Sequence, residues 1–253
     1  MSCKKKVNHL LTQKNMPNWC ANTLSISHED TSTWKWFLST RFDFEKISPQ
    51  IKVTEDNYIE LINRYKDEIG IYEKRITEHE DFDALDLKER KELCDKLEFD
   101  LRSLKCWGTK WKVDIDEEVF IKSENGNSTN VLCFSFCSAW GPPYGIYNKL
   151  NEMGFKLSAN FEEKGCDFIG TYRTKDGELE KEIFSYSMIR NVFFEYRKKN
   201  KDKEDYNEYK FLKIGVEKKL FSEGVADMLD CEIEVWIEEA EEEEEEEVEE
   251  TNE

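Results

Sequence analysis

The sequence predicts an α+β fold in which an antiparallel sheet of βαββαβ order carries an inserted α-helical hairpin and an acidic disordered C-terminal tail. Three observations lead to this prediction. Apolar residues alternate with polar ones in several short stretches, as in half-buried strands. Between these stretches they recur every three or four residues, as in helices. The last sixteen residues contain twelve glutamates and no basic residue.

The first predicted strand follows a short extension of the chain. Residues 1–15 are basic and weakly patterned, and we interpret them as an N-terminal extension. Residues 18–27 alternate, with Leu24 and Ile26 on one face and Asn22 interrupting the pattern. This alternation predicts a strand with one buried face.

Helical periodicity follows in two places. Residues 29–42 predict a helix with an apolar stripe, and its candidate N-caps are Thr31, Ser32 and Thr33. Apolar residues at 58–76 predict a helix of about six turns. A second amphipathic helix is predicted at 93–104, after a short polar link. The two helices together predict an antiparallel hairpin at about residues 55–105.

The period then changes to that of a β-hairpin. Residues 111–121 alternate and predict a half-buried strand, and residues 131–140 predict the strand that returns. Asn125 and Gly126 lie between them and adopt positive φ at low cost, which is typical of a tight turn.

The remaining elements of the sheet come after this hairpin. Residues 144–153 predict a short helix that ends at Gly154, a common C-terminal stop. Residues 155–163 and 166–174 each alternate and predict two further strands. The order is therefore βαββαβ plus one strand, with the helical hairpin inserted before the second strand.

The C-terminal third is less regular. We interpret residues 176–237 as an α/β extension packed on the domain, with a helix at 187–200. A terminal strand is predicted from the alternating apolar residues Ile233, Val235 and Ile237. Residues 238–253 have almost nothing to bury, so we expect a disordered, solvated acidic tail.

Four segments together resemble a known family. They are "MPNWCANTLSI" at 16–26, "WGTKWKV" at 107–113, "FSFCSAWGPP" at 134–143 and "FEEKGCDFIGTY" at 161–172. In this order they resemble the YubB-type ferredoxin-like domain of plasmid, phage and viral proteins. The resemblance covers about residues 16–175 and implies a ferredoxin-like α+β sheet without an iron–sulfur cluster. The family has no assigned function, so it implies no catalytic residues and no cofactor.

Tryptophan, glycine and proline residues mark one candidate binding rim. These residues are Trp19, Trp107, Gly108, Trp111, Trp140, Pro142 and Pro143. In the usual strand order 4-1-3-2, Trp111 begins the second strand and Trp140 ends the third, so the two lie near one end of the hairpin. We expect these residues mainly to close the core. The alternative is a rim that binds a flat ligand, a peptide or an unstacked base.

No motif in the sequence indicates catalysis or a metal site. Cys133 and Cys137 are about 13 Å apart along a strand, too far for a shared zinc ion or a disulfide, so we expect buried thiols. The acidic candidates are explained as solvent-facing strand or turn residues, namely Asp114, Asp116, Glu162, Glu163 and Asp167. There is no phosphate-binding G-x-x-x-x-G-K-[ST] loop. We therefore predict no catalytic residue, metal or cofactor.

Charge and cysteine content limit the class of partner and the compartment. The net charge is −19, of which −12 lies in residues 238–253, leaving −7 for the other residues. This balance argues against a strongly basic nucleic-acid footprint. The eight cysteines are scattered, with no secretory signal and no run of roughly 18 apolar residues. We expect a cytoplasmic protein of the host cell interior, or one associated with virions, and no membrane partner.

These observations favour a non-enzymatic interaction protein of viral or mobile-element origin. We expect a protein partner that is bound through the aromatic end, the helical hairpin or the tail. The tail would suit a basic partner. One alternative is a nucleic-acid-binding module that uses the open sheet face. A second alternative is a metal-dependent hydrolase built from strand carboxylates.

Overall fold

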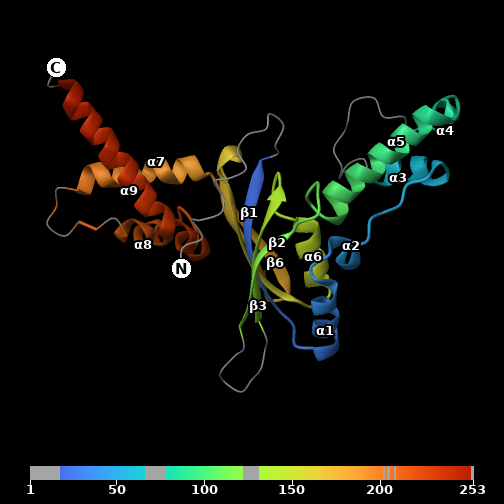
Figure 1. Cartoon of the computed structure of the whole chain (residues 1–253), viewed down its shortest axis with the longest axis horizontal. Coiled ribbons are helices and arrows are strands. Elements are labelled where there is room, and N and C mark those ends of the chain that lie inside the picture. The colour runs from blue at the N-terminus through green and yellow to red at the C-terminus, as the bar shows by residue number, and fades with distance from the viewer. Residues whose placement is uncertain are drawn as a thin grey trace.

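The computed structural model describes residues 18–65, 78–121, 131–201, 203, 206–207 and 209–251. The extension predicted at 1–15, the turn predicted at Asn125 and Gly126, and the second half of the helix predicted at 58–76 lie outside these residues. The described chain has an α+β fold, with one antiparallel sheet and helices on both of its faces (Figure 1).

The described strands form a six-stranded sheet in the order β2-β3-β1-β4-β5-β6. The strands are β1 (Trp19–Ser27), β2 (Ile115–Ile121), β3 (Val131–Ala139), β4 (Lys156–Glu163), β5 (Phe168–Lys175) and β6 (Glu178–Phe184). Each neighbouring pair is antiparallel. Strand β6 was not predicted from the sequence. Most of its residues are exposed, and its sequence therefore lacks the alternation of apolar and polar residues.

The helices lie in two layers and one projecting arm. They are α1 (Thr31–Thr40), α2 (Phe44–Ile47), α3 (Tyr58–Tyr65), α4 (His79–Asp83), α5 (Leu87–Asp100), α6 (Tyr144–Glu152), α7 (Tyr186–Asn200), α8 (Lys210–Glu217) and α9 (Glu223–Thr251). Single turns form at η2 (Glu55–Asn57), η3 (Leu101–Cys106) and η4 (Lys164–Cys166). Helices α1, α2 and α6 cover one face of the sheet, α7 to α9 lie on the other, and α3 to α5 form the arm (Figure 1). No described helix is both long enough and apolar enough to cross a membrane.

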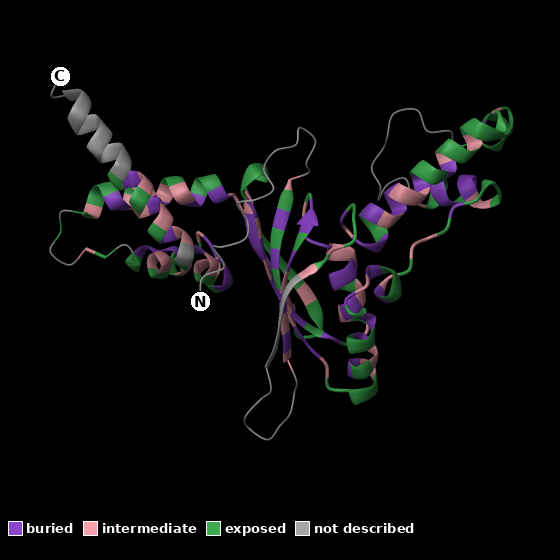
Figure 2. Cartoon of the chain, in the orientation of Figure 1, coloured by how far each residue is buried: buried purple, intermediate pink, exposed green. Residues whose placement is uncertain are grey.

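The main core lies between the sheet and the layer of α1, α2 and α6. Alternate residues of β1 are buried, among them Leu24 and Ile26, because successive side chains of a strand point to opposite faces. Phe134 and Phe136 of β3 and Phe161 of β4 continue the same buried surface. Figure 2 shows buried positions along the strands and on the helices beside them.

The N-cap of α1 corrects the sequence prediction. The helix begins at Thr31, and the preceding residue, Asp30, is its N-cap. The Asp30 Oδ1 atom accepts a hydrogen bond from the Thr33 backbone N–H at 2.7 Å. Asp30 has an extended backbone, and its carboxylate accepts from an N–H that has no partner within the helix. Thr31, Ser32 and Thr33 are therefore helical residues and not the cap.

The inserted arm has a core of its own. Tyr58 stacks on Phe82 with ring centroids 4.6 Å apart, and Ile62 and Leu97 are buried in the same cluster. This packing places α3 against α5, as the predicted hairpin requires. The arm therefore buries its apolar residues in its own cluster, which is separate from the main core under the sheet.

The C-terminal segment is helical where a strand was predicted. The buried residues of α9 recur at spacings of three and four, namely Val225, Leu229, Ile233, Trp236 and Ala240. Val235 and Ile237 are only partly buried. The alternate residues Ile233, Val235 and Ile237 therefore do not form one buried face, as a strand would require. The strand prediction is wrong because the residues that pack against α7 and α8 recur at helical spacing, and this packing outweighs the short alternating pattern.

The acidic tail is likewise helical as far as Thr251. Helix α9 continues through residues 238–251, so the prediction of a disordered tail is wrong for them. Glutamate is a good helix former, and the buried first half of α9 supplies the costly nucleus. Ion pairs join Arg190 to Glu239 at 2.8 Å and Arg197 to Glu241 at 3.7 Å.

The helical assignment of α9 predicts how two adjacent substitutions differ. Trp236 is 1% exposed and donates from Nε1 to the Tyr186 hydroxyl at 3.1 Å. Trp236→Ala should lower the free energy of unfolding by about 3–5 kcal/mol, because it opens a large cavity. Val235→Ala should cost much less, since that side chain is only partly buried. Urea denaturation followed by circular dichroism measures both, and an equal or reversed cost would contradict the helical packing.

Candidate binding site at the aromatic end of the sheet

The seven residues predicted at the candidate rim separate into a buried set and an exposed set. Trp107, Pro142 and Pro143 are buried, and Gly108 lies beside them at the joint between η3 and α6. Trp19, Trp111 and Trp140 are 44%, 44% and 48% exposed. Trp107 packs in the main core cluster, while the second set is exposed to solvent.

Trp107 fixes the position of two helices. Its indole Nε1 donates to the Ser48 carbonyl, just after α2, at 3.0 Å. Its own carbonyl accepts hydrogen bonds from the backbone N–H groups of Gly145 at 3.1 Å and Ile146 at 3.4 Å. Both donors belong to the first turn of α6, where N–H groups lack i−4 partners, and the Ile146 N–H is shared with the Pro143 carbonyl at 3.0 Å. Trp107 is thus a structural residue.

Gly108 permits the close approach of this loop to α6. Its φ is +78°, and a Cβ atom at this position would lie 2.6 Å from the Tyr144 nitrogen. Gly145 is constrained from the other side, since a Cβ there would lie 2.5 Å from the Cys106 carbonyl oxygen. Only glycine satisfies both the positive φ and the space at Gly108.

The exposed tryptophans are held by hydrogen bonds of their backbone neighbours. The Thr109 hydroxyl donates to the Ala139 carbonyl at 2.9 Å, which anchors the loop before Trp111. The Trp140 N–H donates to the Asn18 carbonyl at 2.9 Å, and Trp140 has a φ of +70°. Strand β2 consequently begins at Ile115, and the prediction that Trp111 begins it is wrong, because Thr109 holds this loop through a side-chain contact.

Two of the exposed rings contact each other, and a cation lies beside the third. The rings of Trp19 and Trp111 have centroids 5.9 Å apart and an interplanar angle of 46°. The Lys110 ammonium lies 4.9 Å from the centroid of Trp140, within the range of a cation–π contact. We call the three rings Trp19, Trp111 and Trp140 the tryptophan surface.

A buried polar network supports this surface from below. Asn22 is 4% exposed, and its Nδ2 donates to the Ser138 hydroxyl and the Cys20 carbonyl, both at 2.8 Å. Its Oδ1 accepts from the Tyr147 hydroxyl at 3.2 Å, and Ser138 donates to the Gly141 carbonyl at 2.7 Å. The network joins β1, β3, α6 and the turn after Trp140. The sequence showed Asn22 only as an interruption of the strand pattern.

Titratable groups near this end do not form a metal site. Glu162 pairs with Ala21 in the sheet register, and burial raises the pKa of Glu162. Among the described residues, no group of three or more His, Cys, Asp or Glu side chains could hold a metal ion. Cys133 is partly buried, with its Sγ 3.1 Å from the Ser25 hydroxyl, and Cys137 is exposed. The prediction of buried thiols fails at Cys137 because the helices α1 and α6 cover the opposite face of β3.

An apolar groove lies between α1 and the strands β2 and β3. It has a volume of about 580 Å³ and is lined by Phe37, Leu38, Arg41, Phe42, Ile115, Leu132 and Phe134. The sequence predicted the apolar stripe of this helix, which includes Phe37 and Leu38, but not the groove, since the groove depends on where β2 begins relative to α1. A groove of this apolar character suits protein side chains better than phosphate groups.

Comparisons with known proteins identify no family for this chain. No family model and no curated protein matches it. A solved structure similar to the chain is that of the protein api92 from Yersinia pseudotuberculosis, of the family DUF1281. The two share 12% identity with a TM-score of 0.32, over 66% of this chain and 98% of api92.

The geometry at Gly108 predicts a strong difference between two glycines. Gly108→Ala should lower the free energy of unfolding by about 1–3 kcal/mol, because a methyl group collides with the α6 backbone at an unfavourable φ. Gly141→Ala is the matched control, since a Cβ there meets no atom within 4 Å. Urea unfolding monitored by tryptophan fluorescence measures both variants. Equal stability of the two would show that the joint tolerates a side chain.

Proposed function

We propose that this chain is a non-enzymatic interaction protein that binds an extended segment of a protein partner at the tryptophan surface. The observation that carries the proposal is the exposure of Trp19, Trp111 and Trp140, each close to one half, at one end of the sheet. Tryptophan is highly buried on average, so three half-exposed indoles are unusual on a soluble domain. Exposed apolar surface of this kind commonly marks binding sites.

The support of this surface favours binding over accidental exposure. The Trp140 backbone is held to Asn18, and Thr109 anchors the loop that carries Lys110 and Trp111. Rings on fixed backbone lose little conformational entropy when they bind, and tryptophan is enriched among residues that dominate interface energies. The Lys110 ammonium beside Trp140 adds a preference for an acidic residue in the bound segment.

We further propose a ferredoxin-like topology for the first four strands. The order β2-β3-β1-β4 equals 4-1-3-2 when it is read from the opposite edge, and this order supports the proposal. Helices α1 and α6 connect these strands and pack against the same sheet face. The resemblance to YubB-type domains, with its viral or mobile-element origin and its location inside the host cell, is part of the same proposal.

Single-stranded nucleic acid is the second candidate ligand. The Trp19–Trp111 pair at the end of β1 favours it, because unstacked bases bind to exposed aromatic rings. The net charge of −19 opposes it, because affinity for phosphate depends on lysine and arginine. A protein segment therefore fits the charge of this chain better.

Peptide selection tests the proposal directly. A random peptide library displayed on phage should yield peptides that bind the full chain, and their dissociation constants are then measured by fluorescence anisotropy. Replacing the tryptophan surface by serine should weaken binding by about tenfold or more, as expected for interface residues of this type. A matched control replaces three other exposed apolar side chains, Leu87, Leu104 and Met188, by serine and should leave affinity unchanged.

Two outcomes would overturn the proposal. One is selected peptides that bind equally well to the tryptophan variant and to the control variant. The other is binding of ten-residue oligothymidine or oligouridine, sensitive to the same tryptophans and to salt, without selection of any peptide. The second result would replace the protein partner by nucleic acid.

A further inference from the structure

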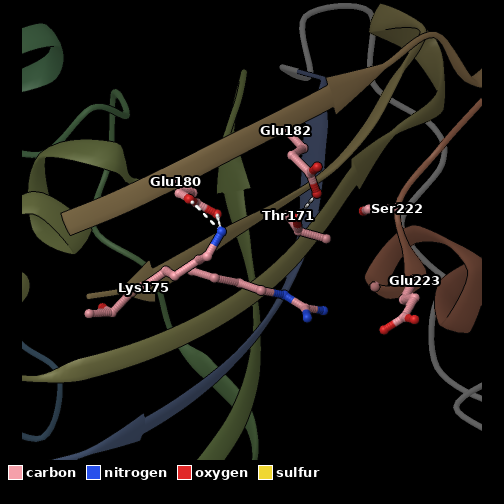
Figure 3. A pocket seen from close by; sticks show the side chains of 9 residues that line it. Thr171, Lys175, Glu180, Glu182, Ser222 and Glu223 are labelled. Carbon is pink, nitrogen blue, oxygen red and sulfur yellow. Dashed lines mark hydrogen bonds and ion pairs between the residues drawn. The ribbon is translucent and has the colours of Figure 1, made fainter. Parts of the chain in front are cut away.

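A second cavity lies where the start of α9 meets the edge of the sheet (Figure 3). Its volume is about 360 Å³. The lining comes from β5, β6 and the first residues of α9, namely Thr171, Arg173, Thr174, Lys175, Glu180, Glu182, Ser222, Glu223 and Gly224. The cavity shares no residue with the tryptophan surface and is within the range of small-molecule pockets.

The guanidinium of Arg173 is placed in this cavity by the absence of a side chain at Gly224. A methyl group on Gly224 would collide with Arg173 Nη2. The buried Arg173 Nε has no hydrogen-bond partner among the described residues, and the guanidinium forms no ion pair with them. A buried donor without a partner destabilises the fold, and a ligand that accepts its hydrogen bond removes that cost.

The carboxylates of Glu180 and Glu182 have partners other than Arg173. Glu180 pairs with Lys175 at 3.0 Å, across the hairpin of β5 and β6. Glu182 accepts a hydrogen bond from the Thr171 hydroxyl at 3.2 Å, and Thr171 is 2% exposed. Figure 3 shows both interactions on the wall that faces the start of α9. Arg173 is therefore available to a ligand in this cavity.

A second unsatisfied group lines the same cavity from the opposite side. The Ser222 hydroxyl is buried and has no hydrogen-bond partner among the described residues. Arg173 on β5 and Ser222 before α9 thus line one space from two separate elements, and rotation about the Ser222 Cα–Cβ bond turns its hydroxyl toward that space. A planar guanidinium binds a carboxylate through two parallel hydrogen bonds, and a serine hydroxyl adds a third.

The acidic residues of the lining restrict the ligand further. Glu182 and Glu223 are exposed side chains on the two walls, and both line the cavity. Because Lys175 pairs with Glu180, these two carboxylates are the negative charges that would repel a phosphate of charge close to −2. They would instead attract an ammonium group. A ligand that suits Arg173 and these carboxylates together has one negative and one positive group a few ångströms apart.

We propose that this cavity binds a small zwitterion of the amino-acid class. Its carboxylate binds the Arg173 guanidinium and the Ser222 hydroxyl, and its ammonium group faces Glu182 and Glu223. The ligand bridges the β5–β6 hairpin and the start of α9, so its binding stabilises the junction between the sheet and the C-terminal helices. This site is independent of the partner binding proposed above.

Isothermal titration calorimetry on the full chain tests the proposal with the twenty free amino acids as probes. At least one should bind and raise the melting temperature. Its N-acetyl derivative, which lacks the ammonium group, and its amide, which lacks the carboxylate, should each bind about tenfold more weakly or not at all. Peptides with the same terminal residue distinguish a free amino acid from a chain end.

Three variants connect the binding to the cavity. Arg173→Met should weaken binding by about tenfold or more, since it removes a charge-assisted pair. Ser222→Ala should weaken it by a smaller factor and disturbs the fold least, so it decides the matter if Arg173→Met does not fold. Arg64→Met is the matched control, because Arg64 is an exposed arginine on α3, away from this cavity. It should bind as the unmodified chain does.

The proposal is overturned by any of three results. The first is that no free amino acid gives heat or a thermal shift. The second is that the amide or inorganic phosphate binds as well as the parent amino acid. The third is that Arg173→Met and Ser222→Ala bind the amino acid without loss.

Discussion

The approach of the chain at Gly108 to the first turn of α6 is the contact on which most of the structure depends. Trp107 accepts hydrogen bonds from two N–H groups in the first turn of α6 through its carbonyl and holds the end of α2 through its indole. Thr109 then binds the last residue of β3. These adjacent residues thus connect the end of the arm to α2, α6 and the sheet. The exposed tryptophans stand just beyond it, so their positions follow from the same contacts.

Strand β5 has a comparable role on the other side of the molecule. Tyr172 packs in the main core with α6, while Ile169 packs in the cluster formed by α7, α8 and α9. Both faces of this strand are buried, whereas one face of β3 leaves Cys137 exposed. The C-terminal helices thus cover only part of the second face of the sheet. The tryptophan surface and the Arg173 cavity lie at different borders of that covered part.

The alternation around Leu24, Phe134 and Phe161 was enough to predict the α+β class and most strands, because buried faces leave a period of two in the sequence. The sequence could not predict which tryptophans of the candidate site are exposed. Trp107 and Trp111 are the same residue type four positions apart, yet neighbouring elements cover only the first. Asn22 looked like a defect because its partners Ser138 and Tyr147 are remote in sequence. The pairing of Arg173 with Gly224 likewise depends on tertiary packing.

The arm illustrates how such a chain tolerates change in length. Near the sheet its two ends are tied together, since Val53 N–H donates to Glu98 at 3.0 Å and Arg102 reaches Gln50 at 3.5 Å. The residues beyond this tie pack among themselves. Residues can therefore be gained or lost at the far end of the arm without shifting the register of the sheet. In evolutionary terms the arm is a region where sequence can diversify while the central domain stays under its own constraints.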